Sequence, residues 1–168
     1  LTSARWELCH TTGFPSQEEG MENGVSACYA GALGGKLIMA GGCNFPDVPA
    51  SDGGKKKFYK GIYAADITAD SVLNWRMVGE LPFASAYGVA TVYNGRLICA
   101  GGTDGTRSLT DVFSVRLKED AWNTVIRSSR LARAGAVLVS GGNYSFYNIN
   151  GELKPGIRTP EITRIWLK

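Results

Sequence analysis

The segment Val92-Tyr93-Asn94-Gly95-Arg96-Leu97-Ile98-Cys99-Ala100-Gly101-Gly102 is the strongest indication of the fold of this chain, because two similar segments recur. They are Leu33-Gly34-Gly35-Lys36-Leu37-Ile38-Met39-Ala40-Gly41-Gly42 and, more loosely, Val139-Ser140-Gly141-Gly142-Asn143-Tyr144 continued through Ile149-Asn150-Gly151. Each is typical of a strand, a tight glycine turn, a second strand and a glycine stop. The stops at Gly42, Gly102 and Gly151 lie 60 and 49 residues apart, a spacing that indicates a repeat architecture.

Further strands extend each repeat beyond this hairpin. Side chains alternate with a period of two after the second glycine stop, which is typical of a strand. Asn94-Gly95 and Gly141-Gly142 are favoured dipeptides for the hairpin turns. Third strands are predicted at Ile62–Asp66, Val112–Lys118 and Ile162–Lys168, and a fourth strand with a tryptophan follows the first two, at Trp75 and Trp122.

These patterns predict an all-β fold of kelch-type β-propeller blades in a single domain, residues 1–168. Three four-stranded blades are expected at about 28–78, 86–125 and 134–168. The third lacks a fourth strand of its own, and the segment Arg5-Trp6-Glu7-Leu8, within residues 4–9, is expected to complete it. Such a clasp would hide both open edges of the ring.

The composition fits one folded domain and excludes several classes of function. With 168 residues, 44% of them hydrophobic, the chain can bury a core. A net charge of +3 is too weak and scattered to indicate nucleic-acid binding. No apolar run is long enough to span a membrane, and the N-terminus shows no signal peptide. The basic cluster Lys55, Lys56, Lys57 and Lys60 is expected to be a solvated loop.

The cysteines and the single histidine predict no metal site. Cys9, Cys28, Cys43 and Cys99 lack the spacing of metal ligands, and Cys99 is expected in the core. His10 has no partner at motif spacing and is expected in a loop or at a sheet edge. A metal site is therefore not expected.

A site is expected on the face where the loops between second and third strands gather around the central channel, together with the loops that lead into the next blade. Loops on a rigid β scaffold commonly carry function. Arginine dominates their charged side chains, which suits an anionic ligand held through a planar fork. These loops supply Asn44, Asp47, Asp104, Arg107, Arg127, Arg130, Glu152 and Arg158.

The loop Gly151-Glu152-Leu153-Lys154-Pro155-Gly156-Ile157-Arg158-Thr159-Pro160 is the least generic of these. A tight turn at Pro155-Gly156 would bring Glu152 and Arg158 to one side. A carboxylate beside a guanidinium can act as an acid/base group with an anion clamp. It can equally be a salt bridge that only orders the loop, and the spacing leaves both interpretations open.

This loop, with Ala40-Gly41-Gly42-Cys43-Asn44-Phe45-Pro46-Asp47 and the following Gly53-Gly54-Lys55-Lys56, resembles the kelch-propeller sialic acid mutarotases, the N-acetylneuraminate epimerases. The similarity is greatest to their cyclically permuted branch, in which the Gly-Glu-x-Lys-Pro-Gly-x-Arg loop falls near the C-terminus. Ala86-Tyr87-Gly88 also fits, and the resemblance covers all three blades.

The resemblance implies an enzyme that interconverts the α and β anomers of N-acetylneuraminic acid without a cofactor. The residues matching the family's proposed catalytic pair are Glu152 and Arg158. A carboxylate can move the protons that open and close the sugar ring, and an arginine can anchor the sugar's own acid group. Asn44, Asp47 and Arg107 are the expected further contacts to the substrate. Exported bacterial members imply the periplasm, although a cytoplasmic location stays open without a signal peptide.

The chain departs from this family in its number of blades, three instead of six. Two interpretations follow. Either two chains associate into a symmetric six-bladed homodimer with two copies of the Glu152 and Arg158 pair, or whole blades have been lost with part of the pocket. Association is favoured, because the open sides of a half-ring would expose large apolar faces. The alternative function is a non-catalytic kelch module that binds an acidic peptide or a sialylated sugar.

Overall fold

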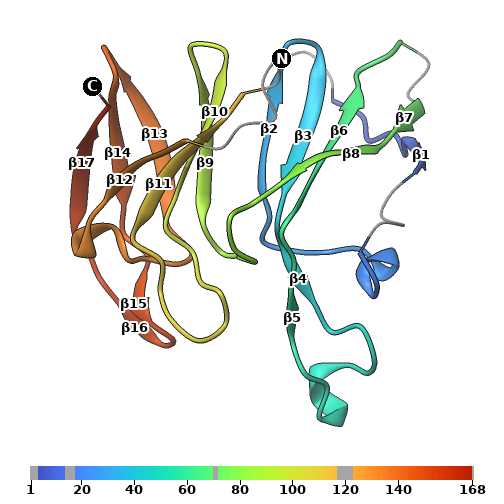
Figure 1. Cartoon of the computed structure of the whole chain (residues 1–168), viewed down its shortest axis with the longest axis horizontal. Coiled ribbons are helices and arrows are strands. Elements are labelled where there is room, and N and C mark those ends of the chain that lie inside the picture. The colour runs from blue at the N-terminus through green and yellow to red at the C-terminus, as the bar shows by residue number, and fades with distance from the viewer. Residues whose placement is uncertain (1–3, 14–17, 70–71, 117–122, 168) are drawn as a thin grey trace.

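The computed structural model of the chain describes residues 4–13, 18–69, 72–116 and 123–167, and the side chains of 123–126 and 129 are not among those described (Figure 1). The strands are β1 (His10–Thr12), β2 (Tyr29–Leu33), β3 (Lys36–Ala40), β4 (Cys43–Asn44), β5 (Lys57–Phe58), β6 (Gly61–Asp66), β7 (Val72–Asn74), β8 (Arg76–Glu80), β9 (Val89–Tyr93), β10 (Arg96–Ala100), β11 (Asp111–Val115), β12 (Asn123–Arg127), β13 (Val137–Gly142), β14 (Ser145–Ile149), β15 (Glu152–Lys154), β16 (Ile157–Arg158) and β17 (Ile162–Trp166). Three short 3₁₀ helices complete the described elements: η1 (Met21–Asn23), η2 (Ala50–Asp52) and η3 (Ser129–Leu131). None of the helices in these ranges is long and apolar enough to cross a membrane.

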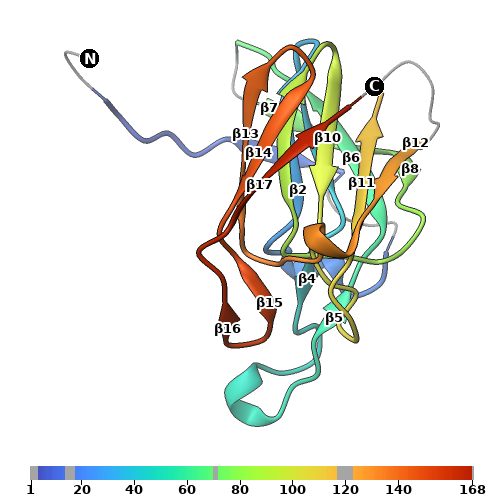
Figure 2. The same cartoon turned by 90° about the vertical axis from the view of Figure 1, so that its left-hand side faces the viewer.

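Three antiparallel sheets stand side by side as propeller blades (Figure 1). Blade 1 has the strand order β2-β3-β6-β8, blade 2 the order β9-β10-β11-β12, and blade 3 the order β13-β14-β17. The small hairpins β4–β5 and β15–β16 project from one end of this row (Figure 2). The predicted all-β class and kelch-type blades are confirmed.

The hairpin turns use left-handed backbone in every blade. Gly34-Gly35 has φ values of 58° and 73°, and Asn94-Gly95 has 47° and 68°, as favoured turns between twisted strands require. In blade 3 the prediction of a turn at Gly141-Gly142 is wrong. The turn is Asn143-Tyr144, with φ of 47° and 57°. A bulge between Ser140 and Gly142 lengthens β13, and Tyr144 is held by a hydrogen bond of 3.1 Å from its backbone N–H to the Tyr93 hydroxyl.

The core lies between neighbouring blades. One cluster joins blade 1 to blade 2, and its largest members include Tyr29, Ile38, Leu97 and Phe113. A second cluster joins blade 2 to blade 3 through residues such as Ile98 and Phe146. Burial of these faces is the main force that holds the row together, since apolar surface leaves water when two sheets stack. Cys99 is in the first cluster, as predicted, and burial raises the pKa of its thiol.

The predicted closing strand, Arg5 to Leu8, does not join blade 3. Residues 4–9 form no strand, and the side chains of Trp6 and Leu8 are almost fully exposed. The segment extends away from the sheets (Figure 2), and β1 after it pairs in parallel with β7 beside blade 1. Blades 1 and 3 are at opposite ends of an open row, so residues 4–9 are far from β17 within one chain (Figure 1).

In blade 1 the predicted fourth strand is observed as β8, but Trp75 lies just before this strand and not within it. Trp75 lies between β7 and β8 and packs against a third apolar cluster, which contains Met21, Met39 and Tyr63. This cluster covers the face of blade 1 that points away from blade 2. Trp122 and the predicted strand ends at Leu117, Lys118 and Lys168 lie outside the described residues.

Candidate functional site

Each blade positions the residue after its glycine stop by the same pair of backbone hydrogen bonds. Ser26 pairs with Cys43, Ala86 with Thr103, and Ala134 with Glu152. For Glu152 the two bonds to Ala134 measure 2.8 and 3.0 Å. Glu152 follows a glycine with a φ of +101°, Gly151, which matches Gly42 and Gly102 at the other stops. The repeat itself therefore fixes the backbone of Glu152.

A second set of backbone bonds links the blades to one another at this level. The N–H of Tyr87 donates to the carbonyl of Ala27, and the N–H of Gly135 donates to the carbonyl of Tyr87, both at 2.8 Å. All three residues have φ near +60°, an unusual conformation for alanine and tyrosine. The three blades thus start from one hydrogen-bonded row, directly beside the Glu152 position.

Glu152 and Arg158 face each other across the β15–β16 hairpin. They are cross-strand partners in the register, and Arg158 Nε lies 3.7 Å from Glu152 Oε1. The turn at Pro155-Gly156 closes the hairpin, with Gly156 at a φ of +77°. The Glu152 side chain is 34% exposed and that of Arg158 is 84% exposed. The ion pair is therefore real but loose, and its carboxylate stays accessible to a ligand.

A buried arginine that the sequence analysis did not single out holds the base of this hairpin. The Arg133 side chain is 1% exposed. Its guanidinium donates to the carbonyl of Glu161 at 2.9 Å and to the carboxylate of Glu161 at 2.6 Å. The backbone bond from Asn150 N–H to the Glu161 carbonyl, 3.0 Å, joins the same two chain segments. Arg133 thereby fixes where the segment carrying Glu152 begins and ends.

A groove of about 1160 Å³ runs between the loops of all three blades. Glu152 forms part of its wall and also part of a smaller hollow of about 570 Å³ on the outer side of blade 3. The groove confirms that the loops between second and third strands share one face. Its wall consists of Lys56, Phe58, Tyr87, Thr103, Asp104, Gly105, Thr106, Arg107, Ser108, Ala134, Gly135, Glu152, Leu153, Lys154 and Pro155.

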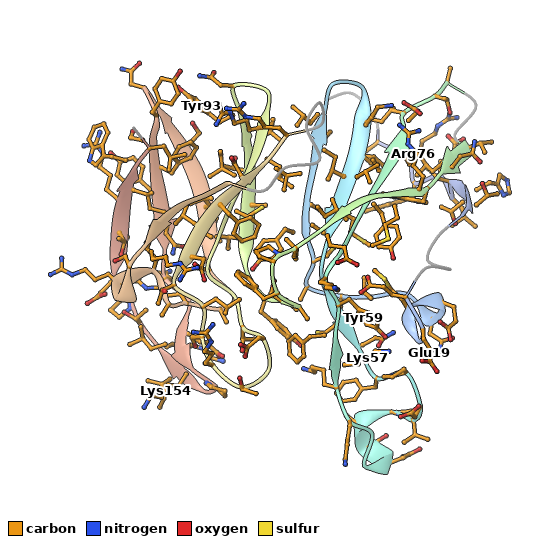
Figure 3. The ribbon with its side chains drawn as sticks, viewed as in Figure 1. Glu19, Lys57, Tyr59, Arg76, Tyr93 and Lys154 are labelled. Carbon is orange, nitrogen blue, oxygen red and sulfur yellow. The ribbon has the colours of Figure 1, made fainter. Side chains whose placement is uncertain are left out.

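The lysines of the basic cluster in the first loop are exposed, as expected, and three of them also form specific contacts. Lys56 enters the groove, where its ammonium donates a 2.7 Å hydrogen bond to the Tyr87 hydroxyl and lies 5.3 Å from the centre of the Phe45 ring. That hydrogen bond raises the pKa of Lys56. Lys57 instead donates to the Glu19 carbonyl at 2.5 Å beside Tyr59 (Figure 3), and Lys60 pairs with Glu80.

Arg107 lies in the groove wall, as the sequence suggested, and is tethered there by Asp104. The Nε of Arg107 is 3.3 Å from Asp104 Oδ2. Burial raises the pKa of Asp104, but hydrogen bonds from the Thr106 hydroxyl, the backbone N–H groups of Arg107 and Thr106 and the Arg107 guanidinium outweigh this and lower it to about 2. The Asp104 carboxylate therefore stays ionised and orders the loop.

Two other sequence candidates lie outside the groove wall. The side-chain amide of Asn44 donates to the carbonyls of Gly20 and Gly24 at 2.6 and 2.9 Å, and its oxygen accepts from the Tyr59 hydroxyl at 2.8 Å. Asn44 thus fastens the segment before blade 1 to the β4 strand. Asp47 is exposed on the loop that follows. The structure does not bring these two residues together with Glu152.

Within the described ranges no three His, Cys, Asp or Glu side chains lie close enough together to hold a metal ion. His10 is exposed in β1, at the edge of blade 1. Of the other arginines predicted near the site, Arg127 is paired with Asp111 at 2.9 Å and Arg130 is exposed after blade 2.

The three sheets define kelch-type β-propeller blades, and the loop-lined groove on one face is the candidate site. Residues 2–124 match the family described as N-acetylneuraminate epimerase, and the chain belongs to this family. The matched residues end before the hairpin that carries Glu152 and Arg158.

Individual relatives agree with this assignment. An N-acetylneuraminate epimerase of Pasteurella multocida (strain Pm70) is 34% identical over 118 residues, 63% of this chain and 29% of that protein. One of Haemophilus influenzae (strain PittEE) is 33% identical over 106 residues, 60% of this chain and 28% of that protein. The structure of YjhT superimposes with a TM-score of 0.69 at 19% identity and covers 86% of this chain and 49% of that one. The chain therefore matches less than a third of the length of these two epimerases.

Proposed function

We propose that this chain acts as a mutarotase that interconverts the α and β anomers of N-acetylneuraminic acid. The observation that carries the proposal is the Glu152 carboxylate, which extends from a hydrogen-bonded backbone position in the groove wall, is partly exposed, and lies 3.7 Å from the Arg158 guanidinium. The names of the family and of the relatives above support the choice of substrate.

The reaction needs only proton transfers around one bond. Glu152 accepts the proton of the anomeric hydroxyl, the bond between the anomeric carbon and the ring oxygen breaks, and the ring oxygen receives a proton, directly or through water. The open-chain ketone then recloses on either face by the reverse steps. Arg158 binds the carboxylate of the sugar acid with its planar guanidinium. Glu152, which also pairs with Arg158, is then close enough to reach the anomeric centre.

The test compares two glutamates that are both ion-paired and partly exposed. Glu152→Gln should slow anomer exchange of N-acetylneuraminic acid, measured by NMR, roughly 100-fold or more. Glu80→Gln is the matched control and should leave the rate unchanged. Glu80 lies outside the groove and pairs with Lys60 at 2.6 Å. Equal rates for wild type and Glu152→Gln would remove Glu152 from the mechanism.

A second candidate function is a binding module without catalysis. The groove wall carries Lys56, Arg107 and Lys154, and Arg158 lines the hollow beside it, so cations surround the space that an acidic peptide or a sialylated sugar would enter. This candidate predicts binding of such a ligand with no acceleration of anomer exchange over buffer. The same NMR sample distinguishes it from the enzyme.

The proposal also includes a homodimer. The hollow beside Glu152 is walled by blade 3 alone among the described residues. A second copy of the chain would supply the other wall and make a ring of six blades.

A further inference from the structure

The outer face of blade 3 presents apolar side chains that the repeat normally buries. Val137, Val139, Ile162 and Trp166 are between 46% and 62% exposed, on the side of the sheet that faces away from blade 2. The Arg164 guanidinium lies over the Trp166 ring at 3.8 Å from its centre. A contiguous apolar patch of this kind marks a contact surface.

The pairing registers identify the same positions in the other blades. Val137, which pairs with Ile149, corresponds to Tyr29 and to Val89, which pair with Ala40 and Ala100. Tyr29 is 0% and Val89 is 8% exposed, because the next blade covers each of them, whereas Val137 is 57% exposed. By the same alignment Ile162 corresponds to Ile62 and Val112, which are 3% and 0% exposed. Blade 3 therefore presents the half of a blade-to-blade contact that a next blade would bury.

Blade 1 presents the complementary half. Each core cluster between blades contains an apolar residue from the segment that leads into the next blade: Leu81 in the first and Leu131 in the second. The third cluster has Met21 in this role, together with Met39 and Tyr63, which correspond to Cys99 and Phe113 of the first cluster. Leu37, which corresponds to the fully buried Leu97, is only half-buried. This is a blade-to-blade contact without its preceding blade.

We infer that these two faces bind each other, so that blade 3 of one copy docks on blade 1 of a second copy and two copies close a ring through two such contacts. Head-to-tail contacts of this kind close when the rotation per contact returns to the start.

Side-chain sizes support a second copy as the occupant. Between blades 1 and 2 the Tyr29 ring lies where a Cβ on Gly88 would be, 2.1 Å from that position. In the inferred contact the smaller Val137 takes the place of Tyr29, and the larger Cys28 takes the place of Gly88.

A second pair of positions shows the same compensation. A Cβ on Gly31 would lie 2.7 Å from Leu97 and 2.9 Å from Val92. In the inferred contact Val139 takes the place of Gly31, and it faces Ala32 in the place of Val92. Where one side of the contact gains volume the other side loses it, as close packing requires.

The row of backbone hydrogen bonds that links the starts of the blades has matching open ends. Tyr87 donates to Ala27 and Gly135 donates to Tyr87. Among the described residues, the Ala27 N–H and the Gly135 carbonyl form no backbone hydrogen bond. In the ring, the Ala27 N–H of one copy would donate to the Gly135 carbonyl of the other and continue the row.

The contact would also complete the candidate site. This consequence rests on the proposed function, whereas the contact itself does not. Within the chain, loops of neighbouring blades touch: a Cβ on Gly105 would lie 2.6 Å from the Phe58 ring, and the Ser108 hydroxyl donates to the Leu153 carbonyl at 3.1 Å. By the same geometry, the β4–β5 hairpin of the second copy would wall the hollow beside Glu152 and Arg158.

The test measures the mass of the chain by sedimentation and light scattering over a range of concentrations. The expected species has twice the mass of one chain. Val139→Lys and Leu37→Glu should each raise the dissociation constant roughly 100-fold or more, because each buries an unpaired charge in an apolar contact. Val48→Lys, at a side chain of similar exposure (44% against 46%) on the first loop, is the matched control and should not change it.

A mixture of the two single variants provides the sharpest result. Val139 of one copy would face Leu37 of the other, so the mixture should form a heterodimer with one lysine–glutamate contact and one unchanged contact. Retention of dispersed amide NMR signals by each variant alone shows that it still folds.

Three results would overturn the inference: a monomer at all concentrations, a dimer insensitive to both variants, or a species that grows beyond two copies. A monomer would mean that further blades or another partner cover blade 3. A dimer that fails to accelerate anomer exchange would contradict the proposed function but not the inferred interface. Exchange that is lost in Val139→Lys and kept in Val48→Lys would show that the second copy completes the site.

Discussion

The fully buried guanidinium of Arg133 donates to the exposed carboxylate of Glu161 at 2.6 Å, beneath the hairpin that carries Glu152. A charge in the interior needs a partner, and here that partner is at the far end of the same hairpin segment. The position of the candidate acid/base group thus depends on an ion pair that lies outside the groove wall.

Removing the acidic partner of Arg133 should destabilise the protein strongly. Glu161→Ala leaves the buried guanidinium uncompensated and should lower the free energy of unfolding by about 3 kcal/mol. Glu80→Ala breaks the Lys60–Glu80 pair, which has the same 2.6 Å separation but two exposed partners, and should cost less than about 1 kcal/mol. Urea denaturation measures both. Equal losses would mean that water reaches Arg133 in solution.

The glycine before Glu152 should not tolerate a side chain. Gly151→Ala would place a Cβ 2.9 Å from the Ala134 carbonyl at a φ of +101°, so we expect it to cost about 2 kcal/mol or more and to displace Glu152. Gly156→Ala is the control, since its φ is also positive but nothing lies within 4 Å of the added Cβ. It should cost about 1 kcal/mol. Denaturation curves and the amide shift of Glu152 report the two effects, and an unshifted Glu152 amide in Gly151→Ala would contradict the second.

Asp104 should make stability depend on pH. Its pKa is lowered to about 2 in the folded chain, below the ordinary value for an unfolded aspartate of about 3.9. The stabilisation is therefore complete above about pH 5 and is lost as the pH falls through 4 towards 2. The difference in unfolding free energy between wild type and Asp104→Asn should shrink over that range. Asp52→Asn, at an exposed residue of η2, serves as the control, and a constant difference for Asp104→Asn would refute the expectation.

Lys56 should contribute to binding of a sugar acid through its charge. Lys56→Met should weaken binding of N-acetylneuraminic acid roughly tenfold, as expected for one charge-assisted hydrogen bond. It should leave the affinity for the methyl ester of the sugar nearly unchanged, because the ester carries no charge. Lys55→Met, one residue earlier and exposed outside the groove wall, is the control. NMR titration measures all three, and equal losses for acid and ester would assign Lys56 to packing against Phe45 instead.

The blades could be predicted from the sequence because their determinants are local. Strand alternation and the paired glycines at the turns and stops act over a few residues, and they placed β3, β6, β10 and β11 to within a few residues. The turn at Asn143-Tyr144 was missed because Gly141-Gly142 offers the stronger local preference. The bulge and the Tyr93 hydroxyl that select the observed turn come from the neighbouring strand and blade.

The candidate site was predictable only where a single hairpin contains it. Glu152 and Arg158 are cross-strand neighbours, so a single turn at Pro155-Gly156 was enough to bring them together. Asn44 lies in a loop where a substrate contact was expected. Its side-chain amide is instead hydrogen-bonded to the carbonyls of Gly20 and Gly24 and to the Tyr59 hydroxyl. No local sequence pattern reveals such distant partners. Arg133 was missed for the same reason. The one feature of the sequence that could have indicated its burial is its position in the repeat, which matches that of the buried Ser85 ahead of blade 2.

The row of backbone bonds through Ala27, Tyr87 and Gly135 bears on how such chains evolve. Each junction between blades uses main-chain atoms at one fixed position, so it makes no demand on the identity of the side chain beyond a left-handed backbone. A gene rearrangement that inserts or excises one complete repeat would therefore leave every remaining junction intact. Relatives with different numbers of blades can arise in this way by recombination in whole units, and only the apolar faces at the new boundaries then need to adapt by point mutation.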